Sequence, residues 1–326
     1  MIRRRILALT LAALAVELSS NRVTNAQTYP TRPITLVVPF AAGGPTDTIA
    51  RIVTEGMRPS LGQPIIIENV GGADGSIAVG RVVRAAPDGY TISIGNVATH
   101  VLNAAAYSLS YDLLNDLEAI SRLTDAPAFI DAKLALPAKD LKELIVWLKA
   151  NPDKASAGVF ATWSRLFGAY FQSSTGTHIQ FVPYRGAAPA MQDLIAGQID
   201  LMFDQAGNTL AQLRNGKIRT YAVAARKRLA LAPDIPTLDE AGVPGFTLSV
   251  WHGMWAPKGT PKSIVAKLNS AIVAALANPA VQQKLIGLGQ EIPSPNQQTP
   301  EALSEYQKAE AEKWWPIIKM ANIKGE

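Results

Sequence analysis

The sequence predicts an α/β protein built from two lobes, each containing a parallel sheet. The chain has 326 residues and is 48% apolar, which is enough to bury the cores of two domains of ~100–200 residues each. Short runs rich in β-branched residues alternate with longer amphipathic stretches, and this alternation is typical of βαβ units. It occurs twice, over residues 34–96 and 141–225, and a helical tail follows.

The first alternation begins with the apolar run ITLVVPF at residues 34–40, which predicts a buried strand. Residues 46–62 predict the helix after it, ending at Gly62, because glycine readily adopts the left-handed conformation that closes a helix. The rest of this block is expected to form a strand over 64–70, a helix over 76–86 and a strand over 90–96.

The second alternation has the same composition and spacing. Its expected helices cover 141–152, 164–176 and 188–198, and its expected strands cover 179–184, 199–204 and 219–225. Residues 260–289 predict helices interrupted by Pro and Gly, and residues 300–321 predict an amphipathic helix. Ligand sites in such sheets lie beyond the carboxyl ends of the strands, so the loops at 39–47, 96–100 and 158–164 are the candidate site.

The first 26 residues have the order of a secretory signal peptide. Arg3, Arg4 and Arg5 precede the apolar run 6–16, and a polar stretch leads to Ala26. The alternative is a membrane anchor, but the apolar run is shorter than the ~20 residues of a spanning helix. We therefore expect cleavage after Ala26 and a periplasmic protein. The chain has no cysteine, so neither disulfides nor a lipidated cysteine are expected.

Charge and motifs argue against several classes of function. Without residues 1–26 the chain has 27 basic and 25 acidic residues and no basic stripe suited to nucleic acid. The three histidines, His100, His178 and His252, lack the spacing of metal ligands, so no metal and no cofactor are expected. Residues 75–82 do not match a phosphate-binding loop, and no Gly-x-Ser-x-Gly motif is present. The residues of the candidate loops are better suited to binding an anion than to catalysing a reaction on it.

The loop between the first strand and helix has few side chains. Its candidate binding residues are Ala42, Gly43, Gly44, Thr46 and Asp47. We expect Thr46 to cap the helix, with Asp47 in the first turn. The unpaired N–H groups and partial positive charge of such a helix start favour an anion. The alternative is that the two glycines only permit a tight turn.

Two further loops repeat this pattern in the second block. Thr162, Trp163 and Ser164 precede a helix, where the hydroxyls could bind a ligand or only cap the helix, and the indole is more often core. Tyr184, Arg185 and Gly186 end one expected strand, and Asp204 ends another. A carboxylate at a strand end could accept a hydrogen bond from a ligand or merely cap the next turn.

Five segments resemble the Bug receptors, the solute-binding proteins of tripartite tricarboxylate transporters in Gram-negative bacteria. The segments are YPTRPITLVVPFAAGGPTDTIAR (29–51), APDGYTISIG (86–95), VPYRGAAPAMQDLIAGQIDLMFD (182–204), APDIPTLDEAGVPGF (232–246) and APKGTPKSIVAKLNSAIVAAL (256–276). The resemblance implies a periplasmic binding protein fold of type II character, with a ligand cleft between two lobes. It implies a discontinuous first lobe of residues 27–126 and 251–326, and a second lobe of residues 127–250.

The resemblance also implies which residues hold the ligand. One carboxylate would be gripped by Ala42, Gly43, Gly44, Thr46 and Asp47 from one lobe and by Thr162 and Ser164 from the other. The backbone near Gly186 and the Asp204 side chain would complete the far wall, and Thr99 would touch the distal end. The expected partners are a small carboxylate and the permease subunits of the transporter, and the receptor is expected to be a monomer. The alternatives are a sensor that docks a membrane signalling kinase, and an enzyme using Asp204 as base.

Four positions depart from the family's pattern. Ala161 and Arg165 replace a common Gly and His, Asp131 lies where the family is apolar, and Trp163 fills a position that is commonly small. We hypothesise that Trp163 and Arg165 favour an aromatic ligand or one with a second carboxylate.

Overall fold

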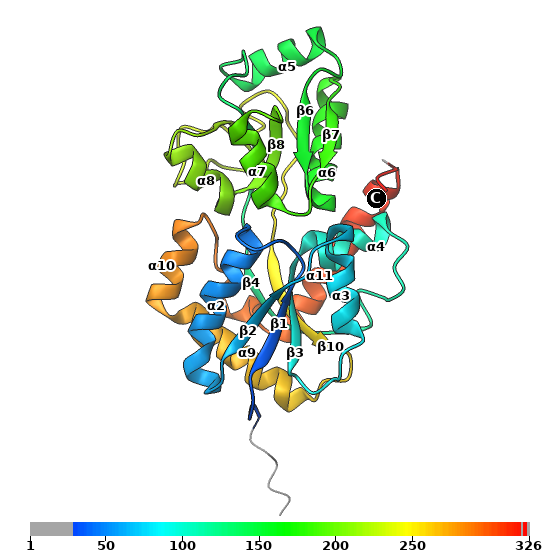
Figure 1. Ribbon diagram of the computed structural model, residues 1–326, viewed down its shortest axis with the longest axis vertical. Helices are drawn as coiled ribbons and strands as arrows, with labels where there is room; N and C mark the ends of the chain where they lie inside the picture. Colours follow the sequence, from blue (N-terminus) through cyan, green and yellow to red (C-terminus); the bar gives the residue numbers. More distant parts are fainter. Residues whose placement is uncertain (1–28, 321, 325–326) are drawn as a thin grey trace, which may run out of the picture. The chain divides into compact units, whose positions relative to one another are not determined.

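Two five-stranded sheets form the framework of the fold (Figure 1). The computed structural model describes residues 29–320 and 322–324, so the predicted signal peptide lies outside the described residues. Residues 32–326 form one compact unit, and of the unit before it only residues 29–31 are described. The first sheet has the order β2-β1-β3-β10-β4, and the second has the order β7-β6-β8-β5-β9.

The strands of the first sheet are β1 (Ile34–Val38), β2 (Ile65–Asn69), β3 (Thr91–Asn96), β4 (Leu117–Thr124) and β10 (His252–Pro257). Those of the second are β5 (Ala128–Ala132), β6 (Ser156–Val159), β7 (Gln180–Pro183), β8 (Leu201–Gln205) and β9 (Arg219–Val223). All positions of β5, β8 and β10 are buried, as expected of strands covered on both faces.

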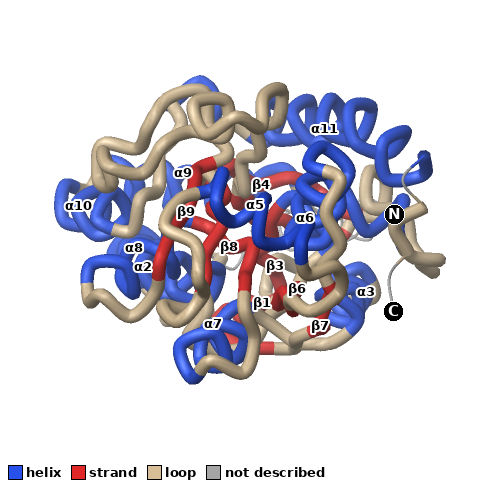
Figure 2. The backbone as a smooth tube through the Cα atoms, turned by 90° about the horizontal axis from the view of Figure 1, so that it is seen from above, coloured by secondary structure: helices blue, strands red, loops and turns tan. Residues whose placement is uncertain are grey.

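Helices cover both faces of the sheets (Figure 2). The α-helices are α2 (Pro45–Leu61), α3 (Ser76–Val83), α4 (Asn103–Ala106), α5 (Leu141–Ala150), α6 (Thr162–Thr175), α7 (Ala187–Ala196), α8 (Ala206–Arg214), α9 (Lys262–Ala277), α10 (Pro279–Gly287) and α11 (Pro300–Met320). Short helical turns are η1 (Ala73–Gly75), η2 (Ala98–Leu102) and η3 (Pro295–Gln297), of which η2 has π-helical hydrogen bonding.

The predicted α/β class is confirmed, and the strands of the predicted βαβ units are parallel, since β1 pairs parallel with β2 and β3. Each sheet also contains a strand of the opposite direction, so the sheets are mixed. β10 lies antiparallel to β3 and β4, and β5 lies antiparallel to β8 and β9. Each of these strands follows a passage of the chain from the other sheet and not a βαβ crossover. The passage enters each sheet at the edge where the parallel strands end. A strand that starts at that edge runs opposite to those strands, so it pairs antiparallel with its neighbours.

The chain passes between the sheets on two neighbouring segments. β4 ends at Thr124 and β5 begins at Ala128, so residues 125–127 form the first passage. Residues 224–251 lead from β9 back to β10. The two segments are hydrogen-bonded to each other, because Ala126 N donates to Val250 O at 3.3 Å and Val250 N donates to Ala126 O at 2.7 Å. We call residues 125–127 and 247–251 the crossing segments.

Most predicted elements are found with small shifts at their ends. The helix expected over 46–62 is α2, and Gly62 closes it in the left-handed conformation, as predicted. The helical block expected over 260–289 is split into α9 and α10 at Asn278, whose side chain caps α10. Among the described residues no single helix is long and apolar enough to cross a membrane. The pair α9 and α10, bent by 73° at their junction, reaches that length and composition only when taken together.

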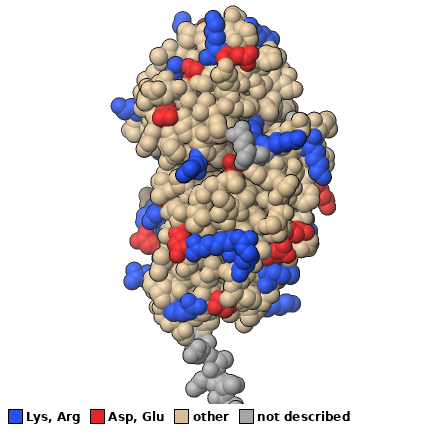
Figure 3. All heavy atoms as spheres, turned by 45° about the vertical axis from the view of Figure 1, so that its right-hand side comes forward, with Lys and Arg blue, Asp and Glu red and all other residues tan. Residues whose placement is uncertain are grey.

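Basic and acidic side chains are interspersed on the face of the molecule shown in Figure 3.

Candidate functional site

The loop after β1 leads into α2 through a start that carries no capping side chain. Gly43 has a positive φ of 83°, Gly44 is the extended N-cap residue, and Pro45 is the first helical residue. Proline suits this position because its φ is already helical and it lacks an N–H that would be unpaired there. The helix therefore begins one residue before Thr46, and the prediction that Thr46 caps it is wrong.

Asp47 lies in the first turn, as predicted, but its carboxylate is used to hold the loop. It accepts hydrogen bonds from Gly43 N and Arg51 Nε at 2.9 Å each and from Asn69 Nδ2 at 3.0 Å. Burial opposes its ionisation, but the hydrogen bonds from Arg51, Gly43 and Asn69 outweigh burial and lower its pKa. The negative charge of Asp47 is therefore compensated within the loop.

A buried histidine ties Thr46 to the strands that adjoin the crossing segments. His252 Nε2 lies 3.1 Å from Thr46 Oγ1, and its Nδ1 lies 3.4 Å from Thr124 Oγ1. Burial lowers the pKa of His252 to about 3, so the ring is neutral at pH 7. Thr46 is thus positioned by a neutral group, and the helix start carries no histidine cation.

A small cavity lies where the starts of three helices meet. It is lined by Phe40, Gly44, Pro45, Thr46, Asn96, Phe160, Ala187 and Gln205. Gly44, Gly186 and Gln205 are the N-cap residues of α2, α7 and α8. Each helix start presents N–H groups without intrahelical partners and a partial positive charge. Since none of the lining residues is charged, the positive field of this cavity comes from the backbone.

The small cavity is nearly filled by the protein. The space open to the centre of a water molecule is about 10 Å³, which is roughly the room that one water needs. The Gln205 side chain is 2% exposed, and its Oε1 has no hydrogen-bond partner among the described residues. A buried acceptor without a partner is costly, so Oε1 is suited to accept from a hydroxyl or a water, whereas a carboxylate would have to be bound by the Nε2 side of the amide.

A second cavity of about 170 Å³ carries the charged side chains. It is bordered by Asp74, Tyr107, Arg165, Tyr184 and Arg185, and Phe160 borders both cavities. Arg165 donates from NH1 to the carbonyl oxygen of Lys324 at 2.7 Å, which fixes its position. Tyr184 Oη donates to Asp193 at 2.7 Å, and burial together with that carboxylate raises the pKa of Tyr184 to about 12. We call the first space the proximal cavity and this one the distal cavity.

Loops from the two sheets meet beside these cavities. Thr162 Oγ1 donates to Asn103 Oδ1 at 2.5 Å and to Asp74 Oδ2 at 3.3 Å. At Gly186, a Cβ atom would lie 3.3 Å from Ala41 Cβ and 3.4 Å from Ala41 N. The turns that precede α2 and α7 therefore approach each other at backbone distance.

The structure brings some of the predicted site residues to the cavities and leaves others beside them. Gly44 and Thr46 line the proximal cavity, and Arg165 and Tyr184 line the distal one. The other predicted residues border neither cavity: Ala42, Gly43, Asp47, Thr99, Thr162, Trp163, Ser164, Gly186 and Asp204. Of these, Gly43, Asp47, Thr162 and Gly186 shape or contact the loops that do.

Three of the remaining predicted residues serve the packing around the site. Ser164 Oγ accepts from Phe160 N at 3.1 Å and donates to Ala161 O at 2.9 Å, so it caps α6. Trp163 is fully buried and packs edge to face on Phe160, with ring centroids 5.4 Å apart. Thr99 Oγ1 accepts from Asn96 N at 3.1 Å. The contacts of Ser164 fit the alternative that its hydroxyl caps the helix, and those of Trp163 fit the alternative that the indole belongs to the core, whereas Thr162 bonds Asn103 and Asp74.

Sequence reasoning missed Asn96, Phe160 and Gln205 as cavity-lining residues. Asn96 and Gln205 are the last residues of β3 and β8, and Phe160 follows the last residue of β6. The rule that sites form beyond the carboxyl ends of strands did select the loops at 96–100 and 158–164, which contain Asn96 and Phe160, but neither residue was named as a candidate. At the end of β8 the sequence analysis named Asp204, whereas its neighbour Gln205 lines the cavity.

Asp204 and Asp131 form a buried acidic pair on neighbouring strands beneath α8. Asp131 accepts from Thr209 Oγ1 at 2.5 Å and from Thr220 Oγ1 at 2.7 Å. Asp204 accepts from Gln205 N at 2.8 Å. Burial raises the pKa of Asp131 to about 7. Burial and then the negative charge of Asp131 raise the pKa of Asp204 well above its usual value, so it is the later of the two to ionise.

This pair predicts that acidification stabilises the protein. The folded pKa of Asp131, about 7, lies above the unfolded value of 3.8, so its stabilising effect is complete below 3.8 and is lost as the pH rises to 7. Between pH 5 and pH 8 the wild type should therefore lose about 2–3 kcal/mol of unfolding free energy relative to Asp131→Asn. Urea unfolding at both pH values measures the difference. Glu312→Gln, an exposed change on α11, is the control, and equal pH slopes for wild type and Asp131→Asn would contradict the prediction.

Two mixed sheets joined by crossing segments, with helix starts facing each other at their strand ends, define a periplasmic binding protein. The chain belongs to the family described as tripartite tricarboxylate transporter family receptor (TctC), whose model matches residues 49–323. The family suggested by the sequence is therefore confirmed, and it is a family of solute-binding receptors.

Three solved structures show what this chain is similar to. The periplasmic binding protein BugD is 42% identical, with a TM-score of 0.88 over 91% of this chain and 100% of BugD. MatC from Rhodopseudomonas palustris, with bound malate, is 39% identical, with a TM-score of 0.86 over 89% of this chain and 100% of MatC. A second R. palustris protein, with adipate, is 33% identical, with a TM-score of 0.85 over 91% of this chain and 99% of that protein.

Proposed function

We propose that this chain is a periplasmic receptor that binds a small dicarboxylate and delivers it to the permease subunits of a tripartite tricarboxylate-type transporter. The carrying observation is the proximal cavity, where three helix starts converge without a charged side chain in the lining. Such a place stabilises a carboxylate through backbone N–H groups. The family and the neighbours with malate and adipate support the same ligand class.

In this proposal the distal cavity takes the second carboxylate. Arg165 and Arg185 border it, and its volume of about 170 Å³ leaves room for a short carbon chain. Phe160, which borders both cavities, would lie against the apolar middle of the ligand. Trp163 borders neither cavity, so we favour an aliphatic diacid over an aromatic ligand.

Binding would work by closure of two lobes around the acid. We assign residues 27–126 and 251–326 to one lobe and residues 127–250 to the other, with residues 1–26 removed on export. Hydrogen bonds to a charged group contribute ~1.5–3 kcal/mol each, so a few from each lobe suffice for micromolar binding. Because each lobe supplies part of the grip, the ligand would favour the closed state, which the permease then recognises.

Isothermal titration with adipate, malate and hexanoate tests the proposal. The diacids are expected to bind with micromolar dissociation constants, and hexanoate, which has one carboxylate, at least tenfold more weakly. Arg165→Gln and Arg185→Gln should each weaken adipate about tenfold and leave hexanoate nearly unchanged, because a lost charged hydrogen bond removes about 1.5 kcal/mol.

The control is Lys142→Gln, an exposed change that borders neither cavity and should leave adipate binding unchanged. Mass spectrometry of the recovered ligand completes the test. A modified acid would contradict a receptor function. Equal binding of hexanoate and adipate would contradict the assignment of the distal cavity.

A further inference from the structure

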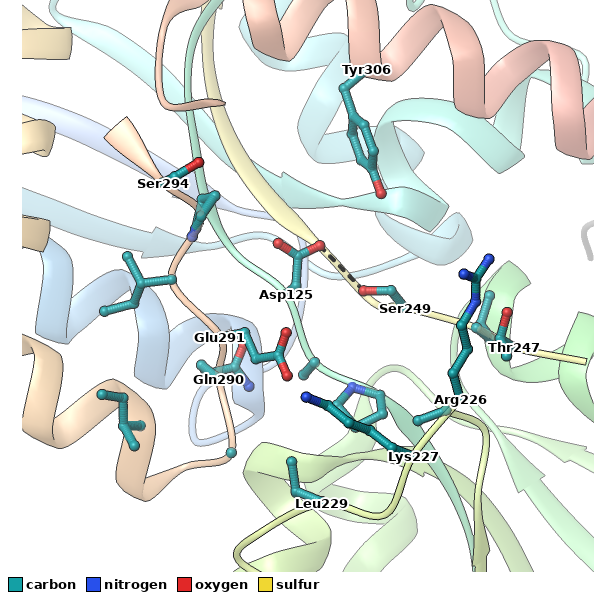
Figure 4. A pocket seen from close by; sticks show the side chains of 18 of the residues that line it. Asp125, Arg226, Lys227, Leu229, Thr247, Ser249, Gln290, Glu291, Ser294 and Tyr306 are labelled. Atoms are coloured by element: carbon teal, nitrogen blue, oxygen red, sulfur yellow. Dashed lines mark hydrogen bonds between the residues drawn. The ribbon is translucent and has the colours of Figure 1, made fainter. Parts of the chain in front are cut away.

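A cavity larger than the proximal and distal cavities lies beside the crossing segments and not at the proposed dicarboxylate site. Its volume is about 1120 Å³. Figure 4 shows side chains that line it. It is bordered by both crossing segments, by residues 226–231 after β9, by residues 289–295 after α10, and by part of α11. We call it the crossing cavity.

A buried amide without a partner faces this cavity. Gln290 is 2% exposed, and neither its Nε2 nor its Oε1 has a hydrogen-bond partner among the described residues. Figure 4 shows its side chain beside that of Glu291 at the cavity wall. An amide that is both a free donor and a free acceptor matches a peptide group, which offers one of each. Leaving it unpaired is costly, and because both amide atoms are covered, an occupant gains that energy when the side chain turns into the cavity.

The charges around the cavity are unevenly compensated. Asp125 is paired with Arg122 at 2.5 Å and accepts from Ser249 Oγ at 3.2 Å, the bond drawn in Figure 4. Arg226 and Lys227 border the cavity, are exposed, and have no ion-pair partner among the described residues. Two carboxylates of the lining, Glu291 and Glu310, have no ion-pair partner there either, but Glu310 accepts hydrogen bonds from Trp251 Nε1 and Trp314 Nε1 and lies close to Lys313 in sequence. The cations Arg226 and Lys227 therefore exceed the remaining carboxylate, Glu291, and favour an occupant that carries carboxylates.

Size and apolar lining complete the description of the occupant. Drug-sized ligands occupy pockets of ~300–1,000 Å³, so this cavity is larger than a small acid requires. Leu229, Leu248, Leu276 and Ile286 supply apolar lining. We propose that the crossing cavity is a docking site for an extended acidic peptide segment of a partner protein. Its carboxylates pair with Arg226 and Lys227, its apolar side chains lie on the leucines, and one of its peptide groups pairs with Gln290.

At this position a docked peptide contacts the segments of the chain that connect the two sheets. Glu291 and Asp125 exchange backbone hydrogen bonds, with Glu291 N donating at 2.7 Å and Asp125 N donating at 2.9 Å. A peptide held at Gln290 and Arg226 spans the segment after α10 and the segment after β9. The partner would therefore dock on the parts of the chain that connect the two sheets.

Fluorescence anisotropy with three labelled hexapeptides tests the proposal on the purified protein. The peptides alternate Leu with Asp, Leu with Asn, or Leu with Lys. The Leu-Asp peptide is expected to bind at least tenfold more tightly than the other two. The measurement uses no dicarboxylate, so its failure is distinct from a failure of the receptor function proposed above.

Variants of the cavity wall separate the parts of the proposed contact. The double change Arg226→Gln and Lys227→Gln should weaken the Leu-Asp peptide at least tenfold and leave the Leu-Asn peptide nearly unchanged. Gln290→Leu, which keeps the side-chain size, should weaken both peptides. The matched control is Lys139→Gln with Lys142→Gln, which removes two exposed charges that do not border the cavity.

Three outcomes would overturn the proposal. One is equal or tighter binding of the Leu-Lys peptide, and another is no binding of the Leu-Asp peptide up to millimolar concentration. The third is displacement of the Leu-Asp peptide by free leucine or aspartate at equal concentration, which would assign the cavity to a small molecule.

Discussion

Replacing Gly186 with Val is expected to weaken adipate binding by a factor of about one hundred or more. A Cβ at this position would lie 3.3 Å from Ala41 Cβ and 3.4 Å from Ala41 N, and the branched methyls of Val need still more room. The turn before α7 could then no longer approach the turn before α2. Losing that approach removes two charge-assisted hydrogen bonds to the ligand. At about 1.5 kcal/mol each, their loss raises the dissociation constant roughly a hundredfold.

The same change should leave the stability of the fold nearly unaltered. Gly186 has a φ of 169°, an extended conformation open to any residue, so Val introduces no backbone strain there. Isothermal titration and thermal unfolding therefore report separate properties. The control is Gly287→Val, because a Cβ at Gly287 meets nothing within 4 Å. Unchanged adipate affinity in Gly186→Val would show that the two turns do not form one binding site.

The part of the site that could be predicted from sequence is the part encoded by local backbone chemistry. Gly43 and Gly44 before Pro45 mark a strand-to-helix turn without capping side chains, and this turn borders the proximal cavity. The helix end at Gly62 was predictable for the same reason, because only glycine takes the left-handed conformation cheaply. Such features depend on residues adjacent in the chain.

The features that were missed depend on residues far apart in the chain. Nothing local indicates that β5 and β10 join their sheets antiparallel, because that direction follows from the passage between sheets. The hydroxyl of Thr162 bonds Asn103, which belongs to the first sheet's part of the chain, and no local pattern indicates that contact. Asp204 and Gln205 are neighbours, and only the pleat of β8 decides which one faces the cavity.

The crossing cavity illustrates the same limit. Arg226, Lys227 and Gln290 are unremarkable in the sequence, and their meeting depends on where the chain returns from the second sheet. Zero cysteines and few titratable groups argued against an enzyme, but composition does not reveal a second cavity. The sequence pattern therefore does not predict which distant parts of the chain lie together.

Replacing Gly95 with Ala is expected to destabilise the protein by about 3 kcal/mol or more. A Cβ at Gly95 would lie 2.0 Å from His100 Nδ1 and 2.6 Å from Thr99 Oγ1. His100 is fully buried and stacks on Trp255 with ring centroids 3.8 Å apart. Its ring would have to leave that stack and the contacts to Thr99 and Ser93, so overpacking and lost hydrogen bonds add.

The melting temperature should accordingly fall by about 5 °C or more, since an unfolding entropy of about 2.1 cal/mol/K per residue makes 1 kcal/mol correspond to about 1.6 °C in a protein of about 300 residues. Gly287→Ala is the matched control, because its Cβ has open space and alanine favours the helix. Equal melting temperatures for Gly95→Ala and wild type would contradict the prediction.

A double variant tests whether the His100 ring is the cause. His100→Ala alone removes the stack on Trp255 and destabilises the protein, but it also removes the ring atoms nearest to a Cβ at Gly95. Thr99 Oγ1, at 2.6 Å, then remains as the close contact and can move by rotation of its side chain, because its bond to His100 is gone. Adding Gly95→Ala to His100→Ala should then cost less than 1 kcal/mol, a coupling of about 2 kcal/mol in a double-mutant cycle. If the two costs simply add, the strain lies in the strand backbone and not in the ring.

Because β3 ends at Asn96 in the proximal cavity, the same cycle measured by adipate affinity tells whether this packing also sets the binding geometry.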